Sequence, residues 1–360
     1  MTGGGIYPAL AVHQALENKS VATLWIGSEK GLEGELLAPF DISYTSIPGG
    51  GIHGMQIAKL PRNIYELMHG YRKAKSIVMD FKPDVVLYTG GYIGVPMAFA
   101  ARKIPSVVFI PDIEPGLALK VIMRYADRIL VSTDRSIPYI QREEKVKVTG
   151  YPLRKEMKMW DRISGRKFFG IHSNEKVVLV FGGSKGAKSI NKALIHHINQ
   201  LTEKMHIIHM TGSDNWADSE TMRNKLEITH AEKYHAFPFL HQEMGAAFAA
   251  ADLAVCRAGA SIIGELPYFG LPAILIPYPH AWRYQFQNAD YFVSNHAAVL
   301  LHDEHLQKRL STQISKLMQD ENKLSIMKKN MQRLAVNDAA DTIAKIVEEV
   351  GQKLKEGKIL

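Results

Sequence analysis

The chain has 360 residues, which is long for one hydrophobic core, so two domains of ordinary size are expected. Hydrophobic residues make up 46% and charged residues 22%, as is typical of a soluble globular protein, and no apolar run is long enough to span a bilayer. The single cysteine, Cys256, excludes an internal disulfide framework and argues against a cysteine-based metal site. The formal charge of +8 favours an anionic partner: a phosphorylated substrate, an anionic lipid or nucleic acid.

In the first half of the chain, short β-branched runs alternate with amphipathic helical stretches. Helical periodicity predicts helices over Pro61–Met79 and Pro115–Tyr125. The runs that predict buried strands are Val21–Ile26, Ile42–Ile47, Asp84–Tyr88, Ser106–Ile110, Arg128–Ser132 and Val146–Thr149.

The same alternation starts again beyond a boundary that we place near Tyr151–Trp160. Two strand–helix series in one chain predict an α/β fold with two doubly wound domains, each built on a parallel sheet covered by helices. The charged, amphipathic tail Asp338–Lys355 predicts a last helix. The strands predicted in this second series are Lys176–Phe181, His206–Met210, Leu253–Cys256, Ala273–Ile276 and Ala298–Leu301.

The opening of the chain departs from this pattern, because no strand precedes the glycines of Met-Thr-Gly-Gly-Gly. In a doubly wound sheet the first strand is central, and such a glycine loop follows it. We therefore expect the first strand of the N-terminal domain to be missing, and the sequence as given to be short by roughly 5–10 residues, an ordinary strand length. The alternative is that neighbouring strands close the gap.

Four glycine segments have the form that joins a strand to a helix. Glycine lets the backbone approach a ligand closely, and the N–H groups that open a helix attract negative charge. A single loop of this kind is more often only a tight turn, but four of them at strand ends favour a phosphate-binding crevice. Neither the P-loop motif nor the dinucleotide fingerprint is present. The four segments are Thr2–Gly5, Thr89–Tyr92, Gly182–Gly186 and Arg257–Ser261.

The stretch from Ala251 to Gln287 carries further candidate site residues. Glu265 falls about one turn into a predicted helix, where a carboxylate can accept two hydrogen bonds from a ribose diol or simply complement the helix dipole. Gln285 and Asn288 follow a strand and the segment PYPH. Their amides suit sugar hydroxyls, since they both donate and accept, although ordinary surface amides would look the same.

With these motifs, the chain resembles the MurG family of lipid-linked GlcNAc transferases, which complete the peptidoglycan precursor. The matching segments run in order over nearly the whole chain: TGGGIYPALAV, TGGYIGVP, ADRILVS, VTGYPLR, GGSKGAKSINKAL and RAGASIIGE. The resemblance implies the GT-B fold, in which two Rossmann-like doubly wound domains, here 1–153 and 154–337, face each other across a cleft. It implies that the last helix, within 338–360, packs back toward the N-terminal domain.

The resemblance also implies the reaction. GlcNAc passes with inversion from UDP-GlcNAc to a muramyl-pentapeptide on a polyprenyl diphosphate, which is the lipid I to lipid II step. Neither a cofactor nor a metal ion is implied, and the sequence has no Asp-x-Asp pair to hold a cation on the diphosphate. The implied partners are UDP-GlcNAc, the polyprenyl-diphosphate-linked acceptor and an anionic membrane surface, and no nucleic acid. The implied location is cytoplasmic, on the inner face of the cell membrane.

Site residues carry over by their motifs. Arg154 and Ser184 would face the diphosphate, Leu240 would offer backbone groups to uracil, and Gln285 would bind the GlcNAc ring, with Asn288 in a more supporting role. Glu265 would meet the ribose hydroxyls at the end of a nucleotide-holding segment. That segment is Ala260, Ser261, Ile262, Ile263, Gly264 and Glu265, and the further substrate-binding positions are Thr2, Gly3, Gly4, Tyr92, Asp112 and Gly183.

The acceptor side departs from the family pattern. The histidine usual in the first glycine loop is Gly5 here, and the family's His-Glu-Gln-Asn segment is Phe109–Asp112. Asp112 becomes the candidate catalytic base, because a carboxylate in a closed cleft can have a raised pKa. The alternative interpretation is a plain loop residue ahead of Pro115.

Two other functions stay open at this point. One is a related glycosyltransferase with a different lipid or small-molecule acceptor, and the other is a non-catalytic UDP-sugar-binding or scaffold protein. Membrane contact is expected through Gly54–Val78, which mixes apolar and basic residues, although an ordinary amphipathic helix has the same mixture. The residues concerned are Met55, Ile57, Leu60, Ile64, Leu67 and Met68 with Lys59, Arg62, Arg72, Lys73 and Lys75.

Overall fold

The computed structural model describes residues 5–17, 19, 21–29, 31, 33–40, 42–49, 60–183, 186–224, 226–280 and 283–355. It divides into two compact units, residues 1–154 with 338–360 and residues 155–337. Several residues predicted for the site or for membrane contact lie outside this description: Thr2, Gly3, Gly4, Met55, Ile57, Lys59 and Ser184, together with the side chains of Leu60, Arg62 and Ile64.

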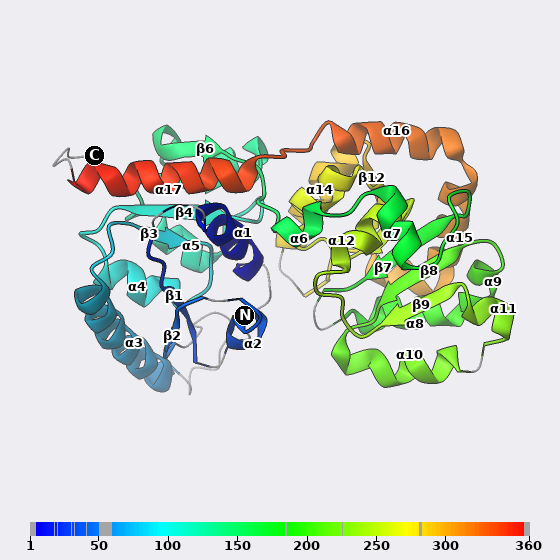
Figure 1. Ribbon diagram of the computed structural model, residues 1–360, viewed down its shortest axis with the longest axis horizontal. Coiled ribbons are helices and arrows are strands. Elements are labelled where there is room, and N and C mark those ends of the chain that lie inside the picture. The colour runs from blue at the N-terminus through cyan, green and yellow to red at the C-terminus, as the bar shows by residue number, and fades with distance from the viewer. Residues whose placement is uncertain are drawn as a thin grey trace. The chain divides into compact units, whose positions relative to one another are not determined.

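The first unit is an α/β unit whose paired strands all run parallel (Figure 1). In the described residues its strands form two separate sheets, one of order β1-β2 and one of order β3-β4-β5-β6. The elements in chain order are α1 (Ile6–Leu16), β1 (Trp25–Ser28), α2 (Glu33–Leu37), β2 (Tyr44–Ile47), α3 (Leu60–Phe81), β3 (Val86–Tyr88), α4 (Gly94–Ala100), β4 (Ser106–Ile110), α5 (Leu117–Ile122), β5 (Arg128–Val131) and β6 (Val146–Val148), with short 3₁₀ turns at Asp134–Tyr139 and Glu143–Lys145.

Burial explains why the strands of the larger sheet are rich in valine and isoleucine. Every residue of β4 is buried, because helices pack against both faces of the sheet. The last helix of the chain, α17 (Ala339–Lys355), belongs to this unit and packs on α1 and β4 (Figure 1). Ile343 and Ala344 of α17 are almost fully buried there.

The second unit is built on one parallel sheet of order β12-β11-β10-β7-β8-β9. Its central strand, β7, is buried along its whole length. The strands are β7 (Val177–Phe181), β8 (His206–Met210), β9 (Tyr234–Phe237), β10 (Leu253–Cys256), β11 (Ala273–Leu275) and β12 (Ala298–Leu300). The helices are α6 (Lys155–Lys158), α7 (Arg162–Phe168), α8 (Lys188–His196), α9 (Ile198–Thr202), α10 (Trp216–Arg223), α11 (Ile228–Ala231), α12 (Met244–Ala250), α13 (Ile262–Phe269), α14 (Tyr284–Ser294), α15 (Leu306–Gln319) and α16 (Glu321–Gln332), with 3₁₀ turns at Ser213–Asn215 and Asp303–His305.

The predicted α/β class with parallel sheets is confirmed, and most predicted strands match observed ones within two residues. The strand predicted over Val21–Ile26 is wrong in its placement, because pairing begins only at Trp25, which lies opposite Tyr44. Strand β9 was not predicted. It lies at the sheet edge with alternating buried and half-buried residues, and its short YHAF sequence gives no continuous apolar run.

Candidate functional site

In the second unit, two glycine positions leave the backbone open at the carboxyl ends of neighbouring strands. Gly183 follows β7 with a φ of +89°, and Gly259 follows β10. A Cβ added at either position would meet no heavy atom within 4 Å. The carboxyl ends of parallel strands are where ligands bind in such sheets, so both loops can present backbone N–H groups to a phosphate.

The loop after β7 depends on two further glycines. A Cβ at Gly182 would collide with the backbone nitrogen of Ala187, and one at Gly186, where φ is +75°, would collide with the carbonyl oxygen of Thr211. The chain can therefore turn tightly from β7 into α8 only with glycine at these positions. Ser184, which was predicted to face the diphosphate, lies outside the described residues of this loop.

A buried polar network holds α8 beneath that loop. The amide nitrogen of Asn191 donates to the carbonyl oxygen of Thr211 at 2.7 Å, and its Oδ1 lies 3.1 Å from Nε2 of His209. Nδ1 of His209 lies 2.8 Å from the Tyr234 hydroxyl. Burial lowers the pKa of His209 to about 3, so its imidazole is neutral and orients α8 without adding charge near the loop.

The loop after β10 is held by Arg257, which sequence reasoning had treated only as part of a glycine turn. Its guanidinium donates to Asp303 Oδ1 at 2.5 Å, to Ser189 Oγ at 2.8 Å and to the carbonyl oxygen of Ile276 at 3.1 Å. It also lies over the ring of Tyr278, 5.3 Å from its centroid. One side chain therefore joins the ends of β10 and β11 to α8. Its partners Asp303 and Ser189 lie 46 and 68 positions away along the chain, so no local sequence pattern reveals this role.

The two predicted amides of α14 both hold neighbouring loops. Asn288 is fully buried and donates from Nδ2 to the carbonyl oxygen of Ala258 at 3.0 Å. Oε1 of Gln285 accepts a hydrogen bond of 2.8 Å from the backbone N–H of Tyr278. Gln285 is half-buried, and its contact with a sugar stays a prediction.

The segment that leads into α13 combines buried and accessible residues. The side chains of Ala260, Ile262 and Ile263 are buried, so these residues can reach a ligand only through their backbone. Ser261, Gly264 and Glu265 are partly exposed, and Glu265 lies in the first turn of α13. Its carboxylate lies close enough to the end of β10 to act on Cys256, whose thiol pKa is raised by burial first and by Glu265 second.

In the first unit, the structure joins the first two predicted glycine loops. The Thr89 hydroxyl donates to the carbonyl oxygen of Gly5 at 2.7 Å, which ties the start of α1 to the carboxyl end of β3. Gly90 and Gly91 have φ values of +134° and +83°, which explains why glycine occupies both positions. Tyr92 follows them and is half-buried against the core of this unit.

The loop after β4 carries two carboxylates, of which the sequence prediction named one. Asp112 is half-buried at the carboxyl end of β4. Glu114 is 2% exposed and accepts a hydrogen bond from Lys120 of α5 at 3.3 Å. The Ser132 hydroxyl, directly after β5, donates to the Pro111 carbonyl oxygen at 3.0 Å and so ties the loop to the end of β5. The sequence prediction missed Glu114, because an acid directly before Pro115 looks like an ordinary loop residue.

The remaining predicted residues are placed as follows. The Arg154 guanidinium lies over the ring of Tyr7 from α1, 4.2 Å from its centroid. Leu240 lies shortly after β9 and its side chain is buried, so only its backbone groups are available to the uracil predicted to bind there. Phe109 is 1% exposed and packs edge-on against Tyr151 at 6.0 Å between ring centroids.

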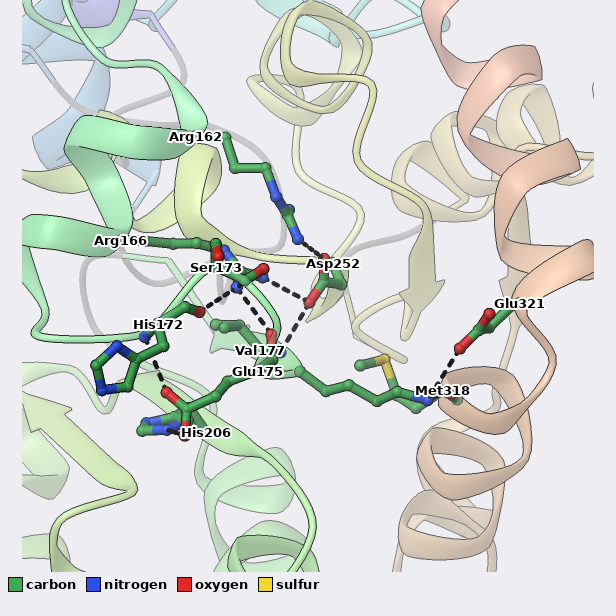
Figure 2. Close-up of polar contacts among 11 residues, drawn as sticks. Arg162, Arg166, His172, Ser173, Glu175, Val177, His206, Asp252, Met318 and Glu321 are labelled. Atoms are coloured by element: carbon green, nitrogen blue, oxygen red, sulfur yellow. Dashed lines mark hydrogen bonds and ion pairs between the residues drawn. The ribbon is translucent and has the colours of Figure 1, made fainter.

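A second cluster of charges lies at the opposite, amino-terminal ends of the second unit's strands (Figure 2). Asp252, directly before β10, accepts hydrogen bonds from Arg162 at 2.6 Å, from Arg166 at 3.0 Å and from the backbone N–H of Val177 at 2.9 Å. Figure 2 shows both guanidinium groups directed at this one carboxylate. The contacts join α7 to the sheet, which is a structural role away from the glycine loops.

Among the residues that the structure describes, no three His, Cys, Asp or Glu side chains gather into a group that could hold a metal ion.

Comparison with known proteins places these features in a family. The glycosyltransferase family 28 N-terminal domain profile matches residues 2–131, and the family 28 C-terminal domain profile matches residues 177–343. A relative from Desulforamulus reducens is 33% identical over 359 residues, covering 97% of this chain and 96% of its own. A relative from Thermoanaerobacter sp. is 33% identical over 355 residues and 97% of each chain. Both are named UDP-N-acetylglucosamine--N-acetylmuramyl-(pentapeptide) pyrophosphoryl-undecaprenol N-acetylglucosamine transferase.

Solved structures show the same fold. MurG from Acinetobacter baumannii superposes with a TM-score of 0.72 at 23% identity, covering 97% of each chain. The UDP complex of MnaA from S. aureus superposes with a TM-score of 0.68 at 14% identity, covering all of this chain and 95% of its own. At these identities the likeness establishes the GT-B fold with its two Rossmann-like domains.

Proposed function

The chain belongs to glycosyltransferase family 28, and we propose that it transfers GlcNAc from UDP-GlcNAc to a muramyl-pentapeptide carried on a polyprenyl diphosphate. The observation that carries the proposal is the pair of open glycine loops, at Gly183 and Gly259, that follow adjacent strands of the second unit. The proposal is also supported by the similarity, over nearly the whole chain, to relatives named for this reaction.

The donor half of the site follows from the second unit. Backbone N–H groups at Gly183 and Gly259 are suited to the diphosphate, and Glu265 is suited to the ribose hydroxyls. Transfer is one displacement: the acceptor oxygen bonds to the anomeric carbon as the bond to the UDP oxygen breaks. The charge that develops on UDP is stabilised by fixed N–H dipoles, with Arg154 as a further cation and no metal ion.

The acceptor hydroxyl must lose its proton to a base in this step, and the loop after β4 offers two carboxylates. We assign the role of this base to Asp112, because its carboxylate is the more accessible of the two, whereas Glu114 is buried against Lys120. Glu114 then orients the loop.

Conservative amide variants separate these roles. Asp112→Asn is expected to lower kcat by about 10²–10⁴-fold with little change in KM for the donor. Glu114→Gln is expected to lower thermal stability more than it lowers kcat. Retention of full kcat in Asp112→Asn would remove this residue as the base.

Acceptor specificity is tested with a panel that holds the donor constant. Purified protein is given UDP-GlcNAc with the muramyl-pentapeptide lipid, with the same lipid lacking its peptide, and with unrelated prenyl phosphates. The proposal predicts transfer to the first acceptor at the highest kcat/KM. Preferential transfer to an unrelated acceptor would indicate a glycosyltransferase with different acceptor chemistry, and donor binding without any transfer would indicate a non-catalytic UDP-sugar-binding protein.

Peripheral contact with an anionic membrane is part of the proposal and has its support in α3. Side chains spaced three and four residues apart form one exposed face of this helix: Tyr65, Met68, Arg72, Lys75 and Met79. Apolar groups interleaved with cations suit the interface of an anionic leaflet. Across the described residues, every helix is too short or too polar to cross a bilayer.

Vesicle sedimentation tests this contact. The protein is expected to sediment with anionic vesicles and to stay in the supernatant with neutral ones. The double variant Arg72→Glu/Lys75→Glu is expected to lose binding, whereas Lys328→Glu/Lys329→Glu, an equal charge change on exposed positions of α16, is expected to keep it. Equal loss in both variants would show a general charge effect and contradict a site on α3.

A further inference from the structure

The Arg154 guanidinium is held in the first unit by an aromatic ring. It lies over the ring of Tyr7, with Cζ 4.2 Å from the ring centroid. The face of an aromatic ring carries partial negative charge and attracts a cation, and the planar guanidinium stacks on such a face better than an ammonium does. The contact joins the first turn of α1 to the segment that follows β6, which is the last strand of this unit.

Tyr7 stands on a fixed platform. Its neighbours Ile6 and Pro8 are buried, and α1 packs along α17 (Figure 1). The carbonyl oxygen of Gly5, just ahead of the helix, accepts the hydrogen bond from Thr89. The Tyr7 side chain itself is half-buried, so part of its ring surface is covered by Arg154 instead of by the hydrophobic core.

The backbone of Arg154 is fixed by the residues before it. Gly150 turns the chain with a φ of +80°, and the three residues that follow it, 151–153, are all buried. Arg154 is half-buried, and its long side chain would sample many rotamers if nothing contacted it. The stack on Tyr7 therefore decides where the positive charge of this side chain lies.

The nature of the contact separates Arg154 from other ordered arginines of the chain. Arg162, Arg166 and Arg257 each pair with an aspartate, which occupies their donors and neutralises their charge. Arg154 has no carboxylate partner in the part of the chain that the structure describes.

A ring and a carboxylate leave an arginine in different states. A ring covers the face of the guanidinium, whereas its N–H groups point outward in the plane and keep their full charge. Those N–H groups are the ones that form paired hydrogen bonds with phosphate oxygens. An arginine held by its face is therefore both ordered and ready to receive an anion.

We propose that Tyr7 is a positioning residue for the donor diphosphate: its ring holds the Arg154 guanidinium in place, with the N–H groups open to phosphate oxygens, before the nucleotide binds. The inference rests on the proposed function, in which Arg154 meets the diphosphate. Tyr7 acts through Arg154 alone. Its effect on affinity arises because the rotamer freedom of the arginine is given up during folding and not during binding.

The test compares binding of UDP with binding of uridine, which lacks the diphosphate. In calorimetric titrations of the full chain, Tyr7→Leu is expected to bind UDP about fivefold more weakly, the scale of one cation–π contact, and uridine with unchanged affinity. Tyr7→Phe keeps the aromatic face and is expected to bind UDP within about twofold of the unmodified chain. A ring that only filled space would affect UDP and uridine alike.

A double-mutant cycle shows whether Tyr7 acts through Arg154. In an Arg154→Ala background, Tyr7→Leu is expected to weaken UDP binding by less than about twofold. Phe99→Leu, which removes an accessible ring from α4 of the same unit, is expected to leave UDP affinity unchanged. Independent, additive losses in the double variant, or an equal loss of uridine affinity in Tyr7→Leu, would overturn the proposal. An intact cycle in a protein that transfers no sugar would refute the proposed reaction and leave this role of Tyr7 standing.

Nuclear magnetic resonance measures the same contact without any ligand. The side-chain N–H resonances of Arg154, identified by their loss in Arg154→Lys, are expected to be shifted upfield by the ring in the unmodified chain and in Tyr7→Phe. In Tyr7→Leu they are expected to return to the ordinary arginine position. The first two proteins decide the question even where Tyr7→Leu does not fold, since an ordinary position in the folded, unmodified chain would overturn the proposal.

Discussion

Replacing Arg257 by glutamine tests whether this one side chain holds the loop after β10 in place. That loop contains Gly259 and is proposed to bind the nucleotide. The change removes the donors to Asp303, Ser189 and the Ile276 carbonyl oxygen and leaves a shorter amide in their place. The loop that contains Gly259 should then lose its fixed position relative to α8. Both folding stability and nucleotide affinity are expected to fall.

The size of the effect follows from burial. Breaking a buried ion pair typically destabilises by about 3–5 kcal/mol. The Arg257 side chain is 10% exposed and that of Asp303 is 23% exposed, so water can partly replace the lost donors. We therefore expect the free energy of unfolding to fall by about 1.5–3 kcal/mol, the range for hydrogen bonds to a charged group. Loss of loop order is expected to weaken UDP binding by about tenfold, equivalent to about 1.4 kcal/mol.

Arg166→Gln is the matched control. The Arg166 side chain is 3% exposed, so it is more buried than that of Arg257. It donates to Asp252 and to the carbonyl oxygens of His172, Ser173 and Glu175, at the amino-terminal side of the same sheet (Figure 2). It should lower stability comparably but leave UDP affinity unchanged. Denaturant unfolding and calorimetric titration with UDP measure the two quantities. Equal loss of UDP affinity in both variants, or none in Arg257→Gln, would refute the specific role of Arg257.

Three further predictions concern the donor site, the metal and pH. Glu265→Ala is expected to weaken UDP binding by about 1–3 kcal/mol in calorimetry, while Glu304→Ala, at an exposed position, should not; unchanged affinity in the first variant would remove Glu265 from the ribose contact. EDTA is expected to leave the transfer rate unchanged, and strict dependence on added magnesium or manganese would contradict a diphosphate site made of N–H groups and Arg154. For His209, the unfolded chain binds a proton below about pH 6.5, whereas the folded protein stays neutral down to about pH 3, so the free energy of unfolding should decrease by about 1.4 kcal/mol per unit as the pH falls through this window. His209→Gln should flatten that slope in urea unfolding curves, and an unchanged slope would show that other groups cause it.

The sequence was informative where local pattern determines structure. The runs Ser106–Ile110, His206–Met210 and Leu253–Cys256 are short and rich in aliphatic residues, and each is a strand with those bounds. Glycines at Gly90, Gly183 and Gly186 likewise adopt positive φ, as turns at strand ends require. Such features depend on neighbours along the chain, so a single sequence reveals them.

Contacts between distant segments were beyond the sequence. Arg257 acts through Asp303 and Ser189, which are 46 and 68 positions away, and nothing local to any of the three indicates the others. Glu114 looked like an ordinary loop acid until its burial against Lys120 was known. The edge strand β9 was missed for a related reason. Only alternate residues of this strand are buried, so its sequence shows no continuous apolar run.

The central claim is tested most directly by one transfer reaction in the presence of EDTA. Purified protein is mixed with labelled UDP-GlcNAc and a muramyl-pentapeptide on a short polyprenyl diphosphate, and labelled lipid and released UDP are counted together. The account predicts one labelled GlcNAc on lipid for each UDP released, at a rate that falls in Glu265→Ala. UDP release without labelled lipid, or no turnover by a protein that binds UDP-GlcNAc, would contradict it.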